Sequence, residues 1–191
     1  MPRGRQSRKD FILEKIGNRS IVLVGMMGCG KSAIGKMLAH KLELDFRDAD
    51  AEIEIAADRS IAEIFEDYGE PEFRRLETRV IERLLGDGPY VLAVGGGAFM
   101  NDETRRTIIE KGLSVWLKVD LETLLERVMR KPGKRPLLTK GDPKQIMTDL
   151  LKAREPVYAK AELHVQSQGG RKSDMRNYLL QCLYDLSLIH I

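Results

Sequence analysis

The sequence has 191 residues, of which 42% are hydrophobic and 32% are charged, and its formal net charge at pH 7 is +3. The length predicts one domain, and the mixture of apolar and charged residues excludes collagen-like, low-complexity and disordered chains. The balanced charge argues against a nucleic-acid-binding protein, and no apolar run approaches the roughly 18 residues that cross a membrane.

Residues 1–20 begin with a basic stretch that contains Arg3, Arg5, Arg8 and Lys9. Such a stretch suits a nucleic-acid-binding arm or a targeting peptide. It is short, however, has no hydrophobic region and is followed by acidic residues, which is atypical of a targeting signal. We therefore predict a solvated tail that leads into a short helix.

Five short segments are predicted to form strands, with helical periodicity between them. The first, residues 21–24, is a continuous and mostly β-branched apolar run, typical of a strand covered on both faces. The others are residues 44–47 (the weakest candidate), 90–94, 114–119 and 162–165. Alternating strands and helices predict right-handed crossovers and a parallel sheet. We expect a single α/β domain over residues 21–185.

Two helix starts and one loop are marked by their residues. Ser60 and Glu63 form a capping box, and Asp120 is placed to cap the helix after the fourth strand. Asp120 also ends a strand, as a Walker B aspartate would, but Lys118 interrupts the apolar run and favours the capping role. The glycine- and lysine-rich residues 130–142 predict a mobile loop. The apolar end, residues 186–191, either caps a terminal helix or is a cloning remnant.

Residues 25–32, Gly-Met-Met-Gly-Cys-Gly-Lys-Ser, match the phosphate-binding pattern G-x-x-x-x-G-K-[ST]. They lie between a predicted buried strand and an amphipathic helix, which is the context that this P-loop pattern requires. Its backbone N–H groups and the helix N-terminus attract phosphate oxygens. We expect Lys31 to reach the β- and γ-phosphates and Ser32 to coordinate Mg²⁺. GTPases, motor ATPases and small-molecule kinases share this loop, but the D-x-x-G of a GTPase is absent.

Carboxylates and glycines follow two other predicted strands. Asp48 and Asp50 come after residues 44–47, and Gly95, Gly96 and Gly97 come after residues 90–94. The carboxyl ends of parallel strands line one edge of a sheet, so these residues should lie near the P-loop. One carboxylate could hold a Mg²⁺ water and the other a substrate hydroxyl, while glycines let backbone N–H groups approach a ligand. Taken singly, an ordinary acidic pair and a flexible turn remain alternatives.

Three arginines stand in distinct short motifs: Arg74 after Phe73, Arg135 before Pro136, and Arg154 in Arg-Glu-Pro-Val-Tyr. Each alone would be an ordinary solvated charge. Together they offer forked donors for a carboxylate and positive charge for a phosphoryl group, which a kinase acting on a small carboxylate needs.

The complete set of motifs resembles the shikimate kinase family. The resemblance covers most of the chain, about residues 21–165, and its motifs stand in the family's order. They are the P-loop, residues 46–50, Gly69-Glu70 with Phe73-Arg74, the glycines 95–97, residues 135–138 and residues 154–158. Two positions depart from the common pattern, since Ala49 and Ala33 stand where many members have threonine. Neither change removes a ligand-binding group.

The resemblance implies which residues bind the nucleotide and its metal ion. ATP would be held by the P-loop and by two arginines of the segment 130–142: Gly28, Cys29, Gly30, Lys31, Ser32, Ala33, Arg130 and Arg135. Arg130 would stack on adenine, and Arg135 would close over the phosphates as part of a lid. Mg²⁺ would be held by Ser32 and, through water, by Asp48.

The resemblance also implies the acceptor site and the reaction. Asp50 would bind the shikimate hydroxyls and accept a proton, Arg74 and Arg154 would grip the carboxylate, and Gly95, Gly96 and Gly97 would bind through their backbone. Lys31, Asp50 and Arg135 would be catalytic. The implied fold is a three-layer α/β/α sandwich with a five-stranded parallel sheet, as in nucleoside monophosphate kinases. The implied reaction converts shikimate and MgATP to shikimate 3-phosphate and ADP.

Rival functions make different demands on the residues. A gluconate kinase would share the P-loop but not the combined acidic pair, glycine triplet and Arg-x-Pro-x-Tyr pattern. A nucleotide-binding regulator without catalysis would not need the intact Lys31, Asp48, Asp50 and Arg135. A nucleic-acid-binding adaptor would have to rely on the basic tail. We therefore expect a monomeric kinase that binds neither nucleic acid nor membranes.

The cysteines and histidines support no other chemistry. The two cysteines, Cys29 and Cys182, are far apart, and the three histidines form no metal-binding spacing. With no secretory signal, the sequence predicts a reducing, cytoplasmic compartment.

Overall fold

The computed structural model describes residues 6–130, 141–167 and 171–188. Its strands are β1 (Ser20–Val24), β2 (Phe46–Asp48), β3 (Val91–Ala93), β4 (Gly112–Lys118) and β5 (Leu163–Gln166). Its helices are α1 (Arg8–Ile16), α2 (Lys31–Leu42), α3 (Ala49–Ala57), α4 (Ile61–Asp87), the 3₁₀ helix η1 (Ala98–Met100), α5 (Asp102–Lys111), α6 (Leu121–Met129), α7 (Pro143–Tyr158) and α8 (Lys172–Leu188).

The strands form one parallel sheet in the order β2-β3-β1-β4-β5. The predicted five-stranded parallel sheet is confirmed, and each strand lies within two residues of its predicted bounds. Strand β1 is central, with Leu23 level with Ala93 of β3 and with Val115 of β4. Its residues 21–24 are fully buried, which explains why its sequence is continuously apolar.

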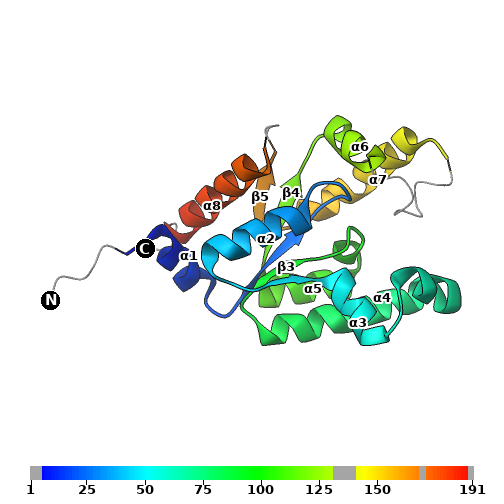
Figure 1. The fold of residues 1–191 in the computed structure, drawn as a ribbon, viewed down its shortest axis with the longest axis horizontal. Coiled ribbons are helices and arrows are strands. Elements are labelled where there is room, and N and C mark those ends of the chain that lie inside the picture. Colours follow the sequence, from blue (N-terminus) through cyan, green and yellow to red (C-terminus); the bar gives the residue numbers. More distant parts are fainter. Residues whose placement is uncertain (1–5, 131–140, 168–170, 189–191) are drawn as a thin grey trace.

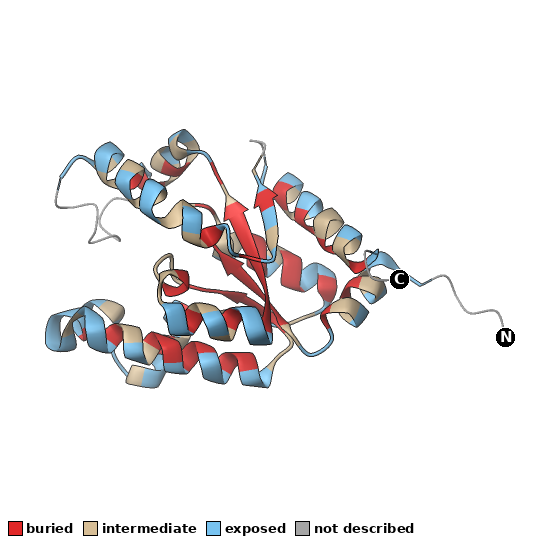
Figure 2. Cartoon of the chain, turned by 180° about the vertical axis from the view of Figure 1, so that it is seen from behind, coloured by how far each residue is buried: buried red, intermediate tan, exposed pale blue. Residues whose placement is uncertain are grey.

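Helices cover both faces of the sheet and produce three layers. Helices α2 and α8 lie on one face and α4 and α5 on the other (Figure 1). Helix α1 packs against α8, where Ile12 and Ile16 are buried and the Phe11 ring meets Tyr184 edge-on at 5.9 Å. Buried residues concentrate in the strands and on the inward sides of the helices (Figure 2). No helix in the described parts of the chain is long and apolar enough to span a membrane.

Helix α4 bends at Gly69, five residues before Arg74. It begins at the predicted capping box, in which Ser60 and Glu63 cap each other's backbone. At Gly69 the backbone turns to φ 77° and ψ 174°, a region open in practice only to glycine, and Pro71 follows. The helix then continues along the core. This bend separates its mostly exposed first two turns from the segment that carries Arg74.

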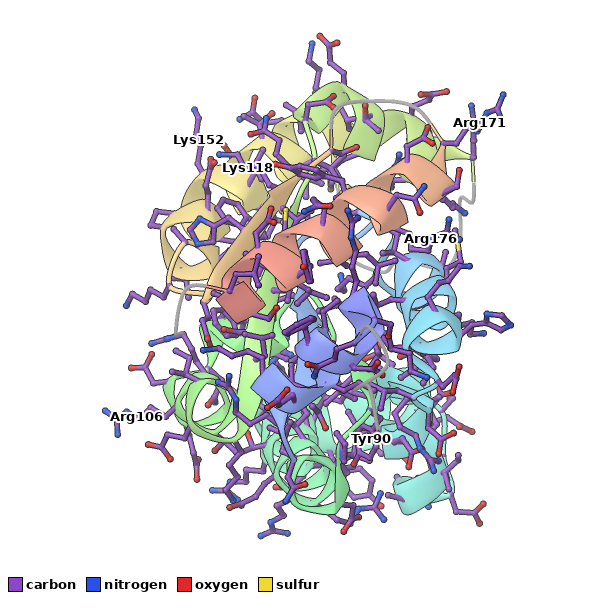
Figure 3. All side chains as sticks on the ribbon, turned by 90° about the vertical axis from the view of Figure 1, so that its left-hand side faces the viewer. Tyr90, Arg106, Lys118, Lys152, Arg171 and Arg176 are labelled. Atoms are coloured by element: carbon purple, nitrogen blue, oxygen red, sulfur yellow. The ribbon has the colours of Figure 1, made fainter. Side chains whose placement is uncertain are left out.

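Helix α6 begins after strand β4, where Asp120 accepts a hydrogen bond from the backbone N–H of Thr123. The predicted N-cap is therefore confirmed. Lys118, the charged residue before it, ends β4 and pairs with Glu155 of α7. Figure 3 shows Lys118 close to α7, the helix that also carries Lys152.

Candidate active site

The P-loop joins β1 to α2, as predicted. Gly30 precedes the first turn of α2 in a left-handed conformation, so the helix N-terminus opens directly onto the loop. Lys31 Nζ donates hydrogen bonds to the carbonyl oxygens of Gly25 and Met26, at 2.8 and 3.1 Å. Lys31 therefore lies across the loop, with its charge held at the mouth of the phosphate cradle.

An open cavity of about 740 Å³ extends from the P-loop to the carboxyl ends of β2 and β3. Its lining brings together these predicted site residues: Gly28, Cys29, Gly30, Lys31, Ser32, Ala33, Asp48, Asp50, Gly95, Gly96 and Arg130. The lining also holds Arg127, Arg171 and Lys172, which with Arg130 make a cationic end of the cavity beside the P-loop, where Arg127 donates to the Gly28 carbonyl. Arg171 stands just before α8 (Figure 3). This cationic end was not anticipated from the sequence. Arg135 and the other residues 131–140 of the predicted lid at 130–142 lie outside the described residues.

Asp48 lies toward the P-loop, and Asp50 lies toward the glycine turn. Ser32 Oγ donates to Asp48 Oδ2 at 2.7 Å, and Asp48 Oδ1 accepts from the backbone N–H of Asp50. Mg²⁺ prefers oxygen ligands and takes one or two from protein, with phosphates and water completing its shell. No cluster of three or more metal-ligating side chains occurs in the described residues. The hydroxyl–carboxylate pair of Ser32 and Asp48 fits a nucleotide-borne Mg²⁺.

Asp50 keeps contact with the open cavity, yet its surroundings favour the protonated form. Partial burial raises the pKa of the Asp50 carboxyl, and the neighbouring negative charge of Asp48 raises it further, while Lys31 opposes the shift. A carboxylate with a raised pKa binds a proton more readily than an ordinary aspartate. Asp50 is thus suited to take up a proton at the end of the cavity nearest Gly95.

The three glycines make room for different site residues. A Cβ on Gly95 would lie 3.0 Å from Glu77 Oε1 and 3.1 Å from Asp50 Oδ1. A Cβ on Gly96 would lie 3.3 Å from Arg154 Nη1, and one on Gly97 would collide with Arg74 Nη2 at 2.6 Å. The turn after β3 is therefore the point where Asp50, Arg74 and Arg154 converge. Within the described chain, the amide N–H groups of Gly96 and Gly97 donate no hydrogen bond.

Arg74 is held by carboxylates on its own helix. Its Nη1 donates to Glu77 Oε2 at 2.7 Å, and its Nη2 donates to Glu70 Oε1 at 3.0 Å. Glu70 is mostly exposed, whereas Glu77 is 1% exposed. The guanidinium is thereby fixed beside the glycine turn with one side toward the core.

The sequence reasoning missed Glu77. Its second oxygen, Oε1, is buried without a hydrogen-bond partner among the described residues. Burial raises the pKa of Glu77 despite the opposing charge of Arg74. A signal was available, because Glu77 lies on the apolar stripe of α4 with Phe73, Ile81 and Leu84. A buried oxygen that faces Gly95 and lacks a donor is a group suited to receive a ligand hydroxyl.

Arg154 comes to the turn from helix α7. Its Nη1 donates to the Gly96 carbonyl at 3.2 Å, and the hydroxyl of Tyr158 donates to the same oxygen at 2.5 Å. The ion pair between Lys118 and Glu155 ties the same helix to β4. The Arg-Glu-Pro-Val-Tyr motif therefore contributes three side chains that fasten α7 beside the site, where the sequence had suggested only one.

Comparisons with known proteins agree with this arrangement. The shikimate kinase family model matches residues 27–184. A shikimate kinase of Brucella canis is 51% identical over 174 residues, which is 91% of this chain and 86% of that protein. A shikimate kinase of Caulobacter vibrioides is 57% identical over 149 residues, 78% of this chain and 74% of that protein.

Among solved structures, the shikimate kinase from Acinetobacter baumannii in complex with shikimate superposes with a TM-score of 0.84 at 35% identity. The superposition covers 94% of this chain and 99% of that one. A family match over most of the chain, close relatives and the same fold all coincide with the convergent P-loop, acidic pair and arginines. The chain belongs to the shikimate kinase family.

Proposed function

We propose that this chain transfers the γ-phosphoryl group of MgATP to the 3-hydroxyl of shikimate, giving shikimate 3-phosphate and ADP for chorismate and aromatic amino-acid synthesis. The observation that carries the proposal is the convergence of Asp50, Arg74 and Arg154 around the glycine turn, beside the P-loop. The P-loop and Asp50 line one cavity, and Arg74 and Arg154 lie against the glycine turn that borders it, an arrangement that suits phosphoryl transfer to a small hydroxy acid.

The nucleotide would bind along the P-loop with its base toward the cationic end of the cavity. The loop amides and Lys31 would hold the phosphates, and Lys31 would exchange the carbonyls of Gly25 and Met26 for phosphate oxygens. Arg130 lines the cavity and is placed to stack on adenine. The catalytic role of Arg135 rests on the sequence resemblance alone.

Ser32 and Asp48 would hold Mg²⁺, Ser32 directly and Asp48 through water. The ion, when bound, neutralises charge on the phosphates and draws electron density from the transferring group. The pair already shares a 2.7 Å hydrogen bond, so both oxygens face one small volume next to the P-loop.

The acceptor would lie against the glycine turn. Arg74 and Arg154 would bind its carboxylate through forked N–H donors, and the free N–H groups of Gly96 and Gly97 would add backbone hydrogen bonds. Asp50 and the free Oε1 of Glu77 would accept hydrogen bonds from ring hydroxyls. With its raised pKa, Asp50 would accept the proton of the attacking hydroxyl.

A coupled assay of ADP release tests the proposal with four reactions: shikimate, quinate, gluconate and no acceptor. We expect rapid release with shikimate alone among the four. Faster turnover with gluconate would assign a different small-molecule kinase, and equal release in all four would indicate an ATPase.

The proposal describes a monomer in the cytoplasm. Cys29 and Cys182 are both free thiols, which suits a reducing compartment. Light scattering on the purified protein with MgATP and shikimate measures the subunit number directly.

A further inference from the structure

The hydroxyl of Tyr158 is buried beside the glycine turn, and Tyr158 does not line the cavity. Tyr158 has no exposed surface, and its hydroxyl donates to the carbonyl of Gly96 at 2.5 Å. Arg154, one turn earlier on the same face of α7, donates to that oxygen at 3.2 Å. A carbonyl oxygen has two lone pairs, so it can accept both bonds at once.

We propose that Tyr158 is a positioning residue for acceptor binding: by holding the Gly96 carbonyl, it sets the direction of the glycine turn and of the Arg154 guanidinium. The proposal rests on the function proposed above. It assigns to Tyr158 no contact with substrate and no part in the chemistry.

The geometry of the peptide bond explains how one hydroxyl acts on the site. In a trans peptide, the carbonyl and the following N–H point to opposite sides. Fixing the Gly96 oxygen toward α7 therefore turns the N–H of Gly97 away from α7. Glycine has wide conformational freedom, so without an anchor this peptide could rotate.

The same bond restrains Arg154. The guanidinium donates one hydrogen bond to the Gly96 carbonyl, and its other N–H groups would donate to a carboxylate. If the Gly96 oxygen moved, Arg154 would lose its fixed point and its fork would no longer be oriented in advance. Preorganisation of this kind lowers the entropy lost on binding.

The surroundings of Tyr158 suit an anchor rather than an acid or base. Trp116 packs against its ring, with the ring centroids 6.0 Å apart. Burial raises the pKa of the Tyr158 hydroxyl to about 12, so the hydroxyl stays protonated and remains a donor throughout the working pH range. A group that never ionises under working conditions gives a constant hydrogen bond.

Tyr158→Phe tests the proposal because it removes one oxygen and keeps the ring. We expect the KM and Kd for shikimate to rise about tenfold, the size of one lost hydrogen bond, with the KM for ATP unchanged. Tyr90→Phe is the matched control: the Tyr90 hydroxyl is also buried and also donates to a backbone carbonyl, that of Leu84. Tyr90 lies well away from α7 (Figure 3).

A second comparison separates positioning from mere stabilisation. In an Arg154→Ala background, Tyr158→Phe should raise the KM for shikimate much less than in the wild type, because the two residues act on one carbonyl. Equal effects in both backgrounds, or an effect no larger than that of Tyr90→Phe, would overturn the proposal. If the wild-type protein itself bound no shikimate by calorimetry, the proposed function would fail instead.

Discussion

Arg74 Nη1 lies 2.7 Å from Glu77 Oε2, and the two side chains differ sharply in exposure, at 26% and 1%. Glu77 therefore holds the guanidinium from the core side, while about a quarter of the Arg74 side chain stays exposed beside the glycine turn. Removing one partner of a buried ion pair leaves the other charge without compensation, which typically destabilises a fold by about 3–5 kcal/mol. Acceptor binding and fold stability are thus coupled at this pair.

Arg74→Ala should weaken shikimate binding far more than ATP binding. A hydrogen bond to a charged group is worth roughly 1.5–3 kcal/mol, a ten- to hundredfold change in Kd. Because Glu77 would lose its partner, the variant should also unfold at lower urea concentration. Calorimetry with each ligand separately measures the first effect. Arg75→Ala, whose side chain is 74% exposed, is the control and should change neither quantity. Equal losses for both ligands would mean that Arg74 does not serve the acceptor.

Glu77→Gln should raise the KM for shikimate by about tenfold and leave the KM for ATP unchanged. The amide keeps the shape of the side chain, but it removes the negative charge beside Arg74. It also replaces one of the two buried carboxylate oxygens with an NH₂ group, which donates hydrogen bonds and cannot accept them. Steady-state kinetics with each substrate varied in turn separates the two constants. Glu72→Gln offers the comparison, because Glu72 forms an exposed pair with Arg75 and should have no effect.

Asp50→Asn should abolish most activity and make stability less dependent on pH. The pKa of Asp50 is raised above 3.8 in the fold, so the folded protein binds this proton more tightly than the unfolded chain does. Stability contributed by Asp50 therefore falls as pH rises from 3.8 through the raised pKa, and asparagine removes that loss. Loss of a general base lowers kcat by about 10²–10⁴-fold.

Urea unfolding over a series of pH values measures the effect of Asp50, and Asp102→Asn provides a control of opposite sign. The hydrogen bond and charge of Arg105 hold the pKa of Asp102 below 3.8. Its contribution is present above that pH and is lost as the pH falls through the lowered pKa. A steeper decline of stability with rising pH in Asp50→Asn than in the wild type would contradict the prediction.

Lys31→Met should eliminate phosphoryl transfer while the protein stays folded by circular dichroism. Lys31 supplies positive charge at the phosphate cradle, and its ammonium bonds to groups of the loop itself, Gly25, Met26 and Cys29. Lys36→Met, five residues later on α2, tests whether the loss of any lysine on this helix has the same effect. Turnover near that of the wild type in a folded Lys31→Met protein would rule out the assigned nucleotide site.

The fold was predictable because its strongest signals are local. A continuous apolar run at 21–24 predicts a doubly covered strand, and Ser60 and Asp120 form the predicted caps. The weakest strand candidate, 44–47, moved to Phe46–Asp48, since β2 is at the edge of the sheet and is only partly buried. Because β2 is only partly buried, its sequence is less apolar, and the signal that predicts a strand is weaker.

The site residues that stand in short sequence motifs could be predicted, whereas those whose importance depends on a distant partner could not. Asp50, Arg74 and Arg154 stand in short motifs, and they converge at the glycine turn. Glu77 pairs with Arg74 three residues away on the same helix, so its partner was within reach of a local pattern. Tyr158 instead donates to the Gly96 carbonyl, 62 residues away, and such a long-range partner follows from packing, which no local pattern contains.

The crowding around the three glycines limits which mutations could make the protein resistant to an inhibitor of this site. Every substitution of glycine adds at least a Cβ, and at residues 95, 96 and 97 that atom would press on the side chains that we assign to the acceptor. A resistant variant altered there would damage its own substrate site along with the inhibitor's. A compound that packs against this turn and uses its free N–H groups therefore leaves the cell few routes of escape by point mutation.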